Sequence, residues 1–229
     1  MSTKKQAVKT PKTKASDMFF LAAVAFVLLL IEPMFNTFFN VSGFNKTIIS
    51  RSAYTVIWVF CSKLLMNSAK KECGFEIFKK EKPLSPVGWV VLSVATAAIV
   101  GYFVWNKLSV FEIIFKNIAV IKVVMAYISM IIVNIAKALV ITIFIAFIQK
   151  GLSISCKKAK WVPLGGIILG LIWCGMFLLA SVGTVFQWTN LIYQLAYGLS
   201  LGILFVLADN KARYAFPFIA VSTFLIFLF

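Results

Sequence analysis

Long apolar runs alternate with short polar segments along most of the chain. A helix needs roughly 20 mostly apolar residues to cross a bilayer, and about seven runs of this kind follow one another. They cover residues 18–39, 47–66, 86–105, 123–148, 164–185, 187–207 and 214–229, of which the last is short for a crossing. The pattern predicts an all-α fold: a polytopic integral membrane bundle of about seven transmembrane helices, forming one domain over residues 18–229.

The segment between the third and fourth runs, residues 107–122, has a different pattern. Its apolar residues recur along one side of a helix, and three charges interrupt them. The apolar positions are Val110, Ile113, Ile114, Ile118 and Ile121, and the charges are Lys107, Glu112 and Lys116. This pattern favours one interfacial amphipathic helix over an eighth crossing, which remains the alternative.

Residues 1–17 form a third kind of segment, with five lysines, one acid, one proline and no aromatic side chain. This composition is typical of a disordered basic tail. The tail resembles the start of a signal peptide. However, the apolar run that follows is too long for a cleavable signal and lacks a clear cleavage site, so we expect a retained first span.

Composition agrees with a membrane protein. The chain is 62% hydrophobic and 13% charged, whereas soluble domains are about half apolar and a quarter charged. It has no histidine, which excludes a Ser/His/Asp triad and a histidine general base. The four cysteines, Cys61, Cys73, Cys156 and Cys174, form no C-x-x-C pair, so we expect free thiols and no metal or other cofactor.

The basic residues indicate both a partner and an orientation. The chain has 23 Lys and Arg residues against 7 acids, but the lysines lie in short loops and not on a nucleic-acid-binding surface. We therefore expect an anionic inner leaflet as the partner, and no nucleic acid. Most of these residues fall in the tail and in alternate loops, which predicts a cell-membrane protein with a cytoplasmic N-terminus and an extracytoplasmic C-terminus.

Polar side chains inside apolar runs are the candidate functional residues, because charges at membrane depth need a partner or water. Lys137 lies near the middle of the fourth run, and Tyr127, Asn134 and Lys137 recur on one helical face. That face should point into the bundle. Three roles are open for it: interhelical hydrogen bonding, a counter-ion for an anionic ligand, or snorkelling of the lysine.

Glu32 is the acid inside a run that could pair with Lys137. Pro33 follows it and should kink the first helix, because proline has no N–H to donate. We hypothesise a Glu32–Lys137 ion pair. The alternative is an interfacial carboxylate at a span that begins earlier than residue 18.

The sixth run carries a second polar face, formed by Gln187, Asn190, Gln194 and Tyr197. These residues would either hold helices together or line a polar cavity.

Two small-residue pairs predict close helix packing. Gly166 and Gly170 lie in the fifth run, and Gly198 and Gly202 in the sixth. Because Gly-x-x-x-Gly spacing lets helix backbones approach each other, we expect these two helices to be packing partners.

The last 100 residues or so resemble the CPBP family of CAAX-protease and bacteriocin-processing membrane proteins. The resemblance covers about residues 123–229 and lies in three segments: Ile135-Ala-Lys-Ala-Leu-Val-Ile through Phe147-Ile-Gln149, Pro163-Leu-Gly-Gly-Ile-Ile-Leu-Gly-Leu-Ile-Trp173, and Tyr197-Gly-Leu-Ser-Leu-Gly. It implies the fold of an intramembrane glutamate protease. Lys137 stands where the family has a glutamate, and the family's histidines are missing, so the resemblance implies a degenerate, non-catalytic member.

Three functions follow as hypotheses. The first is a membrane protein that binds or scaffolds a membrane protein or peptide partner, related to immunity or processing as the family resemblance implies, without enzyme activity. The second is a transporter or channel component with Lys137 lining the substrate path. The third is an enzyme with an unrecognised site, for which the seven acids leave little chemistry.

Overall fold

The computed structural model describes residues 13–38, 44–105, 120–180 and 188–228, and every regular element in these ranges is helical. The elements are α1 (Ala15–Leu29), α2 (Ile31–Phe38), α3 (Phe44–Cys73), α4 (Pro86–Trp105), α6 (Val120–Ser155), the 3-10 helix η2 (Lys157–Trp161), α7 (Leu164–Ala180), α8 (Trp188–Leu207) and α9 (Ala212–Leu228). The all-helical prediction is confirmed. Residues 107–119 of the expected interfacial helix, residues 107–122, lie outside the described residues.

The helices match the seven apolar runs in position, and all but α4 differ from them in length. Within the described ranges, five segments are long and apolar enough to cross a membrane: Ala15–Phe35, Asn45–Cys73, Pro86–Trp105, Val124–Ser155 and Trp188–Leu207. The apolar helices Leu164–Leu179 and Ala212–Ile226 are shorter. Composition and length therefore support five spans directly, and the two short helices complete the predicted seven only if the bilayer accommodates their length.

Two predicted boundaries differ from the structure. Residues 15–17, which we expected in the disordered tail, form the first turn of α1, and Thr13 donates a 2.6 Å hydrogen bond to the Cys73 carbonyl. The third helix also continues past residue 66 to Cys73, where Gly74 adopts a φ of 64°. Lys70 and Lys71 in its last turn interact favourably with the helix dipole, so the helix extends beyond the apolar run.

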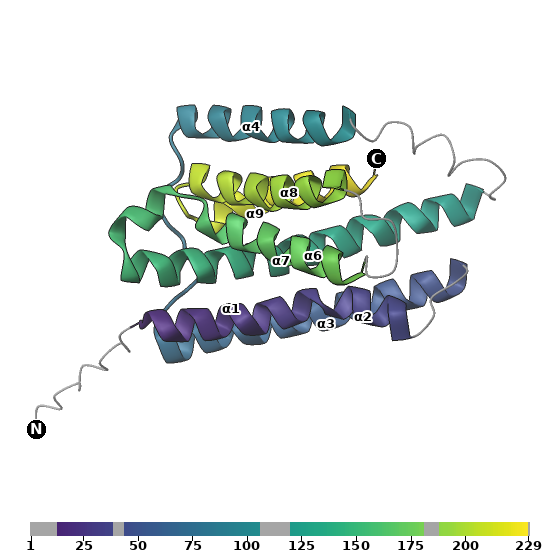
Figure 1. Ribbon diagram of the computed structural model, residues 1–229, viewed down its shortest axis with the longest axis horizontal. Helices are drawn as coiled ribbons and strands as arrows, with labels where there is room; N and C mark the ends of the chain where they lie inside the picture. Colours follow the sequence, from purple (N-terminus) through teal and green to yellow (C-terminus); the bar gives the residue numbers. More distant parts are fainter. Residues whose placement is uncertain (1–12, 39–43, 106–119, 181–187, 229) are drawn as a thin grey trace, which may run out of the picture.

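The helices run side by side, with α6 between two groups (Figure 1). On one side α6 packs against α1 and α3, and on the other against α7 and α9, with α4 outermost over α8 and α9. Residues 141–149 of α6 are all buried. In contrast, only 17% of the residues in the apolar stretch of α4 are buried, so most of α4 faces outward. The core is therefore built around α6, the helix that carries Lys137.

The small-residue prediction for α7 and α8 is confirmed. A Cβ built on Gly198 would lie 2.4 Å from the Gly170 backbone, and one on Gly166 would lie 2.5 Å from Gly202. Real Cβ atoms do not approach a backbone this closely, so only glycine allows the two helices to pack at this distance.

The ends of the bundle differ in charge. Figure 1 shows the start of α1 at the same end as the connections α3–α4, α6–α7 and α8–α9, while α9 finishes at the other end. We call the first the basic end; it carries Lys14, Lys70, Lys71, Lys79, Lys80, Lys82, Lys150, Lys158, Lys160, Lys211 and Arg213. The fold thus gathers on one side the loops that the sequence predicts to be cytoplasmic.

Candidate functional site

A break between α1 and α2 determines the position of Glu32. Pro33 has no N–H for the helical hydrogen bond to the carbonyl four residues earlier, and its ring crowds that turn. The chain therefore makes a turn at Leu30, and α2 begins at Ile31 with Glu32 in its first turn. The predicted kink is confirmed, and it separates Glu32 from the regular surface of α1.

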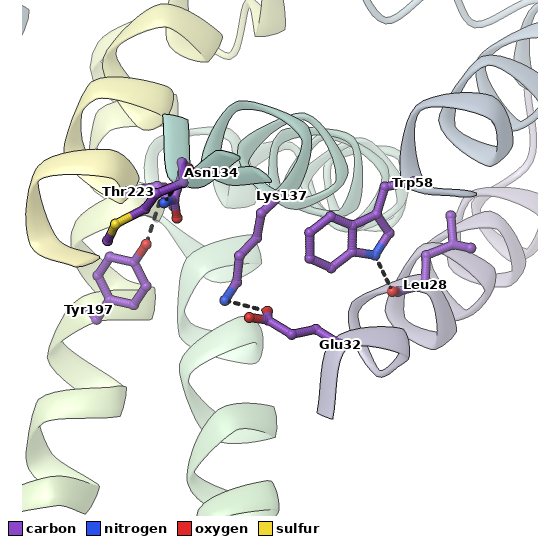
Figure 2. Close-up of polar contacts among 8 residues, drawn as sticks. Leu28, Glu32, Trp58, Asn134, Lys137, Tyr197 and Thr223 are labelled. Carbon is purple, nitrogen blue, oxygen red and sulfur yellow. Dashed lines mark hydrogen bonds and ion pairs between the residues drawn. The ribbon is translucent and has the colours of Figure 1, made fainter. Parts of the chain in front are cut away.

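Trp58 of α3 fixes the position of this break. Its indole N–H donates a buried hydrogen bond of 2.6 Å to the Leu28 carbonyl, and the Trp58 side chain is completely buried (Figure 2). Tyr54 packs against the same indole ring at 5.0 Å between centroids. Carbonyls near a helix break lack regular helical partners, so the Trp58 donor stabilises the irregular backbone inside the bundle.

Lys137 of α6 points toward Glu32, and the two side chains form the hypothesised ion pair. The Lys137 Nζ lies 2.8 Å from Glu32 Oε2, and the side chains are 14% and 26% exposed. Figure 2 shows the Lys137 and Glu32 side chains extending toward each other between α6 and α2. This ion pair supports pairing inside the bundle over a snorkelling lysine. The first helix does begin before residue 18, at Ala15, as the alternative of an interfacial carboxylate supposed.

The ion pair forms part of the wall of a cavity of about 290 Å³ between the helices. Its polar lining consists of Glu32, Lys137, Gln194 and Tyr197. The apolar lining consists of Leu29, Pro33, Trp173, Met176 and Phe177. Within the described residues of this lining, Glu32 is the only acid and Lys137 the only base, so the charges in the wall balance.

Tyr197 and Trp173 form the rigid side of the cavity. Their rings stack with centroids 5.0 Å apart and planes inclined by 11°. The Tyr197 hydroxyl forms a buried 3.1 Å hydrogen bond with the Thr223 hydroxyl of α9 (Figure 2). Because this polar group is bound on the α9 side, Tyr197 presents its ring to the cavity and joins α7, α8 and α9 around it.

The remaining predicted site residues divide between the cavity and other places. Gln194 lines the cavity, whereas Asn190 is exposed in the first turn of α8. Gln187 lies outside the described residues. The sixth run therefore contributes Gln194 and Tyr197 to the site, not its whole polar face.

Two of the predicted residues on α6 lie away from the cavity lining. Asn134 is buried, but its amide donates at 2.8 Å to the Met130 carbonyl of its own helix. Tyr127 is half-buried nearer the start of α6. Asn134 is therefore buried in the bundle, as predicted for this face, but it bonds within α6 and not at the cavity, because an amide in a helix can bond to the preceding turn.

The site can recognise a polar or charged group in an apolar setting. A guest carboxylate could bond to the Lys137 ammonium, and a guest amide or ammonium could bond to the Glu32 carboxylate or to Gln194. Among the described residues no group of three or more His, Cys, Asp or Glu side chains could hold a metal ion. No family model, curated protein or solved structure matches this chain.

Proposed function

We propose that this chain is a non-catalytic multi-pass membrane protein that binds a membrane protein or peptide partner through the cavity around Lys137 and Glu32. The observation that carries the proposal is the 2.8 Å ion pair in the wall of a cavity that apolar helices surround. Burying an ion pair costs desolvation free energy that apolar side chains would avoid, so packing alone does not explain it. The pair also provides both a donor and an acceptor for a guest.

The lining supports a partner that is largely apolar and carries one polar group. Trp173, Met176 and Phe177 offer adaptable apolar surface beside the charges. Methionine and aromatic side chains adapt to helices and peptides of varied shape. A transmembrane helix or a hydrophobic peptide with one amide, carboxylate or ammonium group fits this combination.

The same residues argue against catalysis. An intramembrane glutamate protease needs a carboxylate that accepts a proton from water. Here Glu32 accepts a hydrogen bond from Lys137, and the resemblance to the CPBP family places this lysine where a glutamate is expected. We therefore propose a degenerate, non-catalytic relative of that family.

The proposed topology has seven crossings, with the basic end on the cytoplasmic side of the cell membrane. The collection of lysines at one end supports it, because cytoplasmic loops hold an excess of Lys and Arg. The described chain starts at the basic end and α9 finishes at the opposite end, as an odd number of crossings requires.

Photo-crosslinking in native membranes tests the proposal. A photoreactive amino acid replaces Met176 in the cavity wall or, as a control, the exposed Val94 on α4. We expect a discrete adduct with a membrane polypeptide from position 176, and its loss when Lys137→Ala is added. Equal adducts from both positions, or none from position 176, would contradict the proposal. Solute uptake into liposomes that Lys137→Ala abolishes would support the transport alternative instead.

A further inference from the structure

A second cavity opens at the basic end, away from the Lys137 site. Its volume is about 310 Å³, and it lies where the α3–α4 connection, the last turns of α6, η2 and the α8–α9 turn meet. Cationic side chains from all four segments face it: Lys79, Lys150, Lys160, Lys211 and Arg213. Residues far apart in the sequence thus bring five cationic side chains to the lining of one cavity.

The positive charge in this cavity is only partly neutralised. Its acids are Glu76, Glu81 and Asp209. Asp209 lies 2.9 Å from the Lys211 ammonium and 3.6 Å from that of Lys160. Glu76 is engaged at 3.4 Å by Lys70, which is not part of the lining.

The other cations in the lining are not neutralised by a nearby carboxylate of the described chain. In the described part of the chain, Lys79, Lys150 and Arg213 have no carboxylate within the 4.0 Å of an ion pair. Five cations against three acids therefore leave a net positive lining. Such a lining attracts an anion that can accept several hydrogen bonds at once.

The walls of this cavity are held in place by hydrogen bonds that do not involve its free cations. The buried Gln149 amide donates to the Ala159 carbonyl at 2.7 Å and the Val162 carbonyl at 2.9 Å, and its oxygen accepts from the Gly165 N–H. These bonds fix η2 against the end of α6. The frame therefore exists before a ligand arrives, which lowers the entropic cost of binding.

Two further bonds attach the neighbouring loops. The Asn210 amide donates to the Lys160 carbonyl at 3.0 Å, and the Tyr214 hydroxyl donates to the Glu81 carbonyl at 3.1 Å. All three connections at the basic end are thus joined around the cavity.

The floor of the cavity is apolar. Phe75, Ile77, Ala146 and Phe205 form it, and the Lys150 ammonium lies 5.6 Å from the Phe75 ring centroid. A cationic rim over an apolar floor suits an amphiphilic ligand, because the charged group can contact the rim while carbon atoms contact the floor.

We propose that this cavity binds a phosphate-bearing anion, either the headgroup of an anionic phospholipid or a free phosphate. A phosphate presents several charged oxygens that can accept from several donors at once, and the lining offers three cations without a carboxylate partner among the described residues, Lys79, Lys150 and Arg213. This site is independent of the partner site around Lys137, since no residue lines both cavities.

Thermal unfolding of the purified full chain in neutral detergent tests the proposal. The probes are short-chain phosphatidylglycerol, phosphatidylcholine of the same chain length, and inorganic phosphate, in about 0.3 M salt to screen long-range attraction. We expect phosphatidylglycerol, inorganic phosphate or both to raise the unfolding temperature, and phosphatidylcholine to have no such effect. A response to phosphatidylglycerol alone identifies a lipid headgroup as the source, and an equal response to inorganic phosphate identifies free phosphate.

A matched pair of variants separates the cavity from general surface charge. Lys150→Gln with Arg213→Gln removes two cavity cations, whereas Lys71→Gln with Lys158→Gln removes two exposed cations at the same end that do not line it. We expect the cavity variant to weaken apparent binding by about tenfold or more, because charge-assisted contacts are lost, and the control by less than about twofold.

Equal weakening in both variants, or equal stabilisation by phosphatidylcholine and phosphatidylglycerol, would overturn the proposal. If the cavity variant fails to fold, the comparison of the probes on the unaltered chain and the response of the control variant decide the question.

Discussion

The Lys137 ammonium and the Glu32 carboxylate, 105 residues apart in the chain, lie 2.8 Å apart inside the helix bundle. The pair connects α6, the helix at the centre of the core, with the short helix that follows the break at Leu30. It therefore does two things at once: it neutralises two charges that an apolar environment disfavours, and it fixes the polar part of the cavity wall.

Gly198→Ala should destabilise the protein. Its new Cβ would lie 2.4 Å from the Gly170 backbone, so α7 and α8 would have to separate. We expect a loss of about 1–3 kcal/mol in the free energy of unfolding, as for other overpacked cores. Unfolding in detergent measures it.

Gly175→Ala is the matched control on α7, because a Cβ there meets no atom within 4 Å. Alanine also favours a helix over glycine, by up to about 1 kcal/mol. We expect unchanged or increased stability. Equal destabilisation by Gly175→Ala and Gly198→Ala would show that close α7–α8 approach is not the cause.

Trp58→Phe should destabilise the break between α1 and α2. Phenylalanine keeps an aromatic ring but is smaller than the indole and lacks the N–H that donates to the Leu28 carbonyl, so a buried acceptor loses its partner and a small void is left. We expect a loss of about 1–3 kcal/mol. Trp161→Phe, at an exposed indole, is the control and should have little effect on the unfolding temperature. A Trp58→Phe variant as stable as the parent chain would contradict this role for the hydrogen bond.

Asp209 should make stability at the basic end depend on pH. The hydrogen bond from Lys211 is the main reason that the pKa of Asp209 is lowered, and the nearby charges of Lys211 and Lys160 add to it, while partial burial opposes it. A carboxylate with a lowered folded pKa stabilises the fold above its unfolded value, near 3.8. This stabilisation is lost as the pH falls through the lower folded pKa.

Asp209→Asn should therefore be less stable than the parent chain at neutral pH. The difference should be small, a few tenths of a kcal/mol, since the group is half-exposed. It should shrink toward pH 3. Unfolding temperatures of both proteins at pH 7 and about pH 3 measure it. A difference that stays constant over this range would contradict the role of the ionised carboxylate.

The helices and the ion pair were predictable because both follow from strong physical constraints. Apolar runs of span length have few soluble alternatives, and charges such as Lys137 and Glu32 must find partners inside them. The packing of the Gly166–Gly170 pair of α7 against the Gly198–Gly202 pair of α8 was predictable for a similar reason, since only small residues let two helix backbones approach so closely.

Other features could not be deduced from the sequence because they depend on which neighbour a side chain finds. Asn134 has the right spacing to face the site with Lys137, but it bonds within α6. Trp58 and Gln149 were not predicted to have structural roles, although each places a donor near a helix break or end where carbonyls lack partners. A polar side chain near such a break is the signal that would have indicated them.

A double-mutant cycle on Lys137 and Glu32 tests the central claim most directly. The free energies of unfolding of Lys137→Ala, Glu32→Ala and the double variant are compared with that of the parent chain in the same detergent. The ion pair predicts that Lys137→Ala alone is more harmful than the double variant, by about 1 kcal/mol or more, because the single change leaves the Glu32 carboxylate without its cation. A double variant whose loss equals the sum of the two single losses would show that these residues do not interact and would contradict the account.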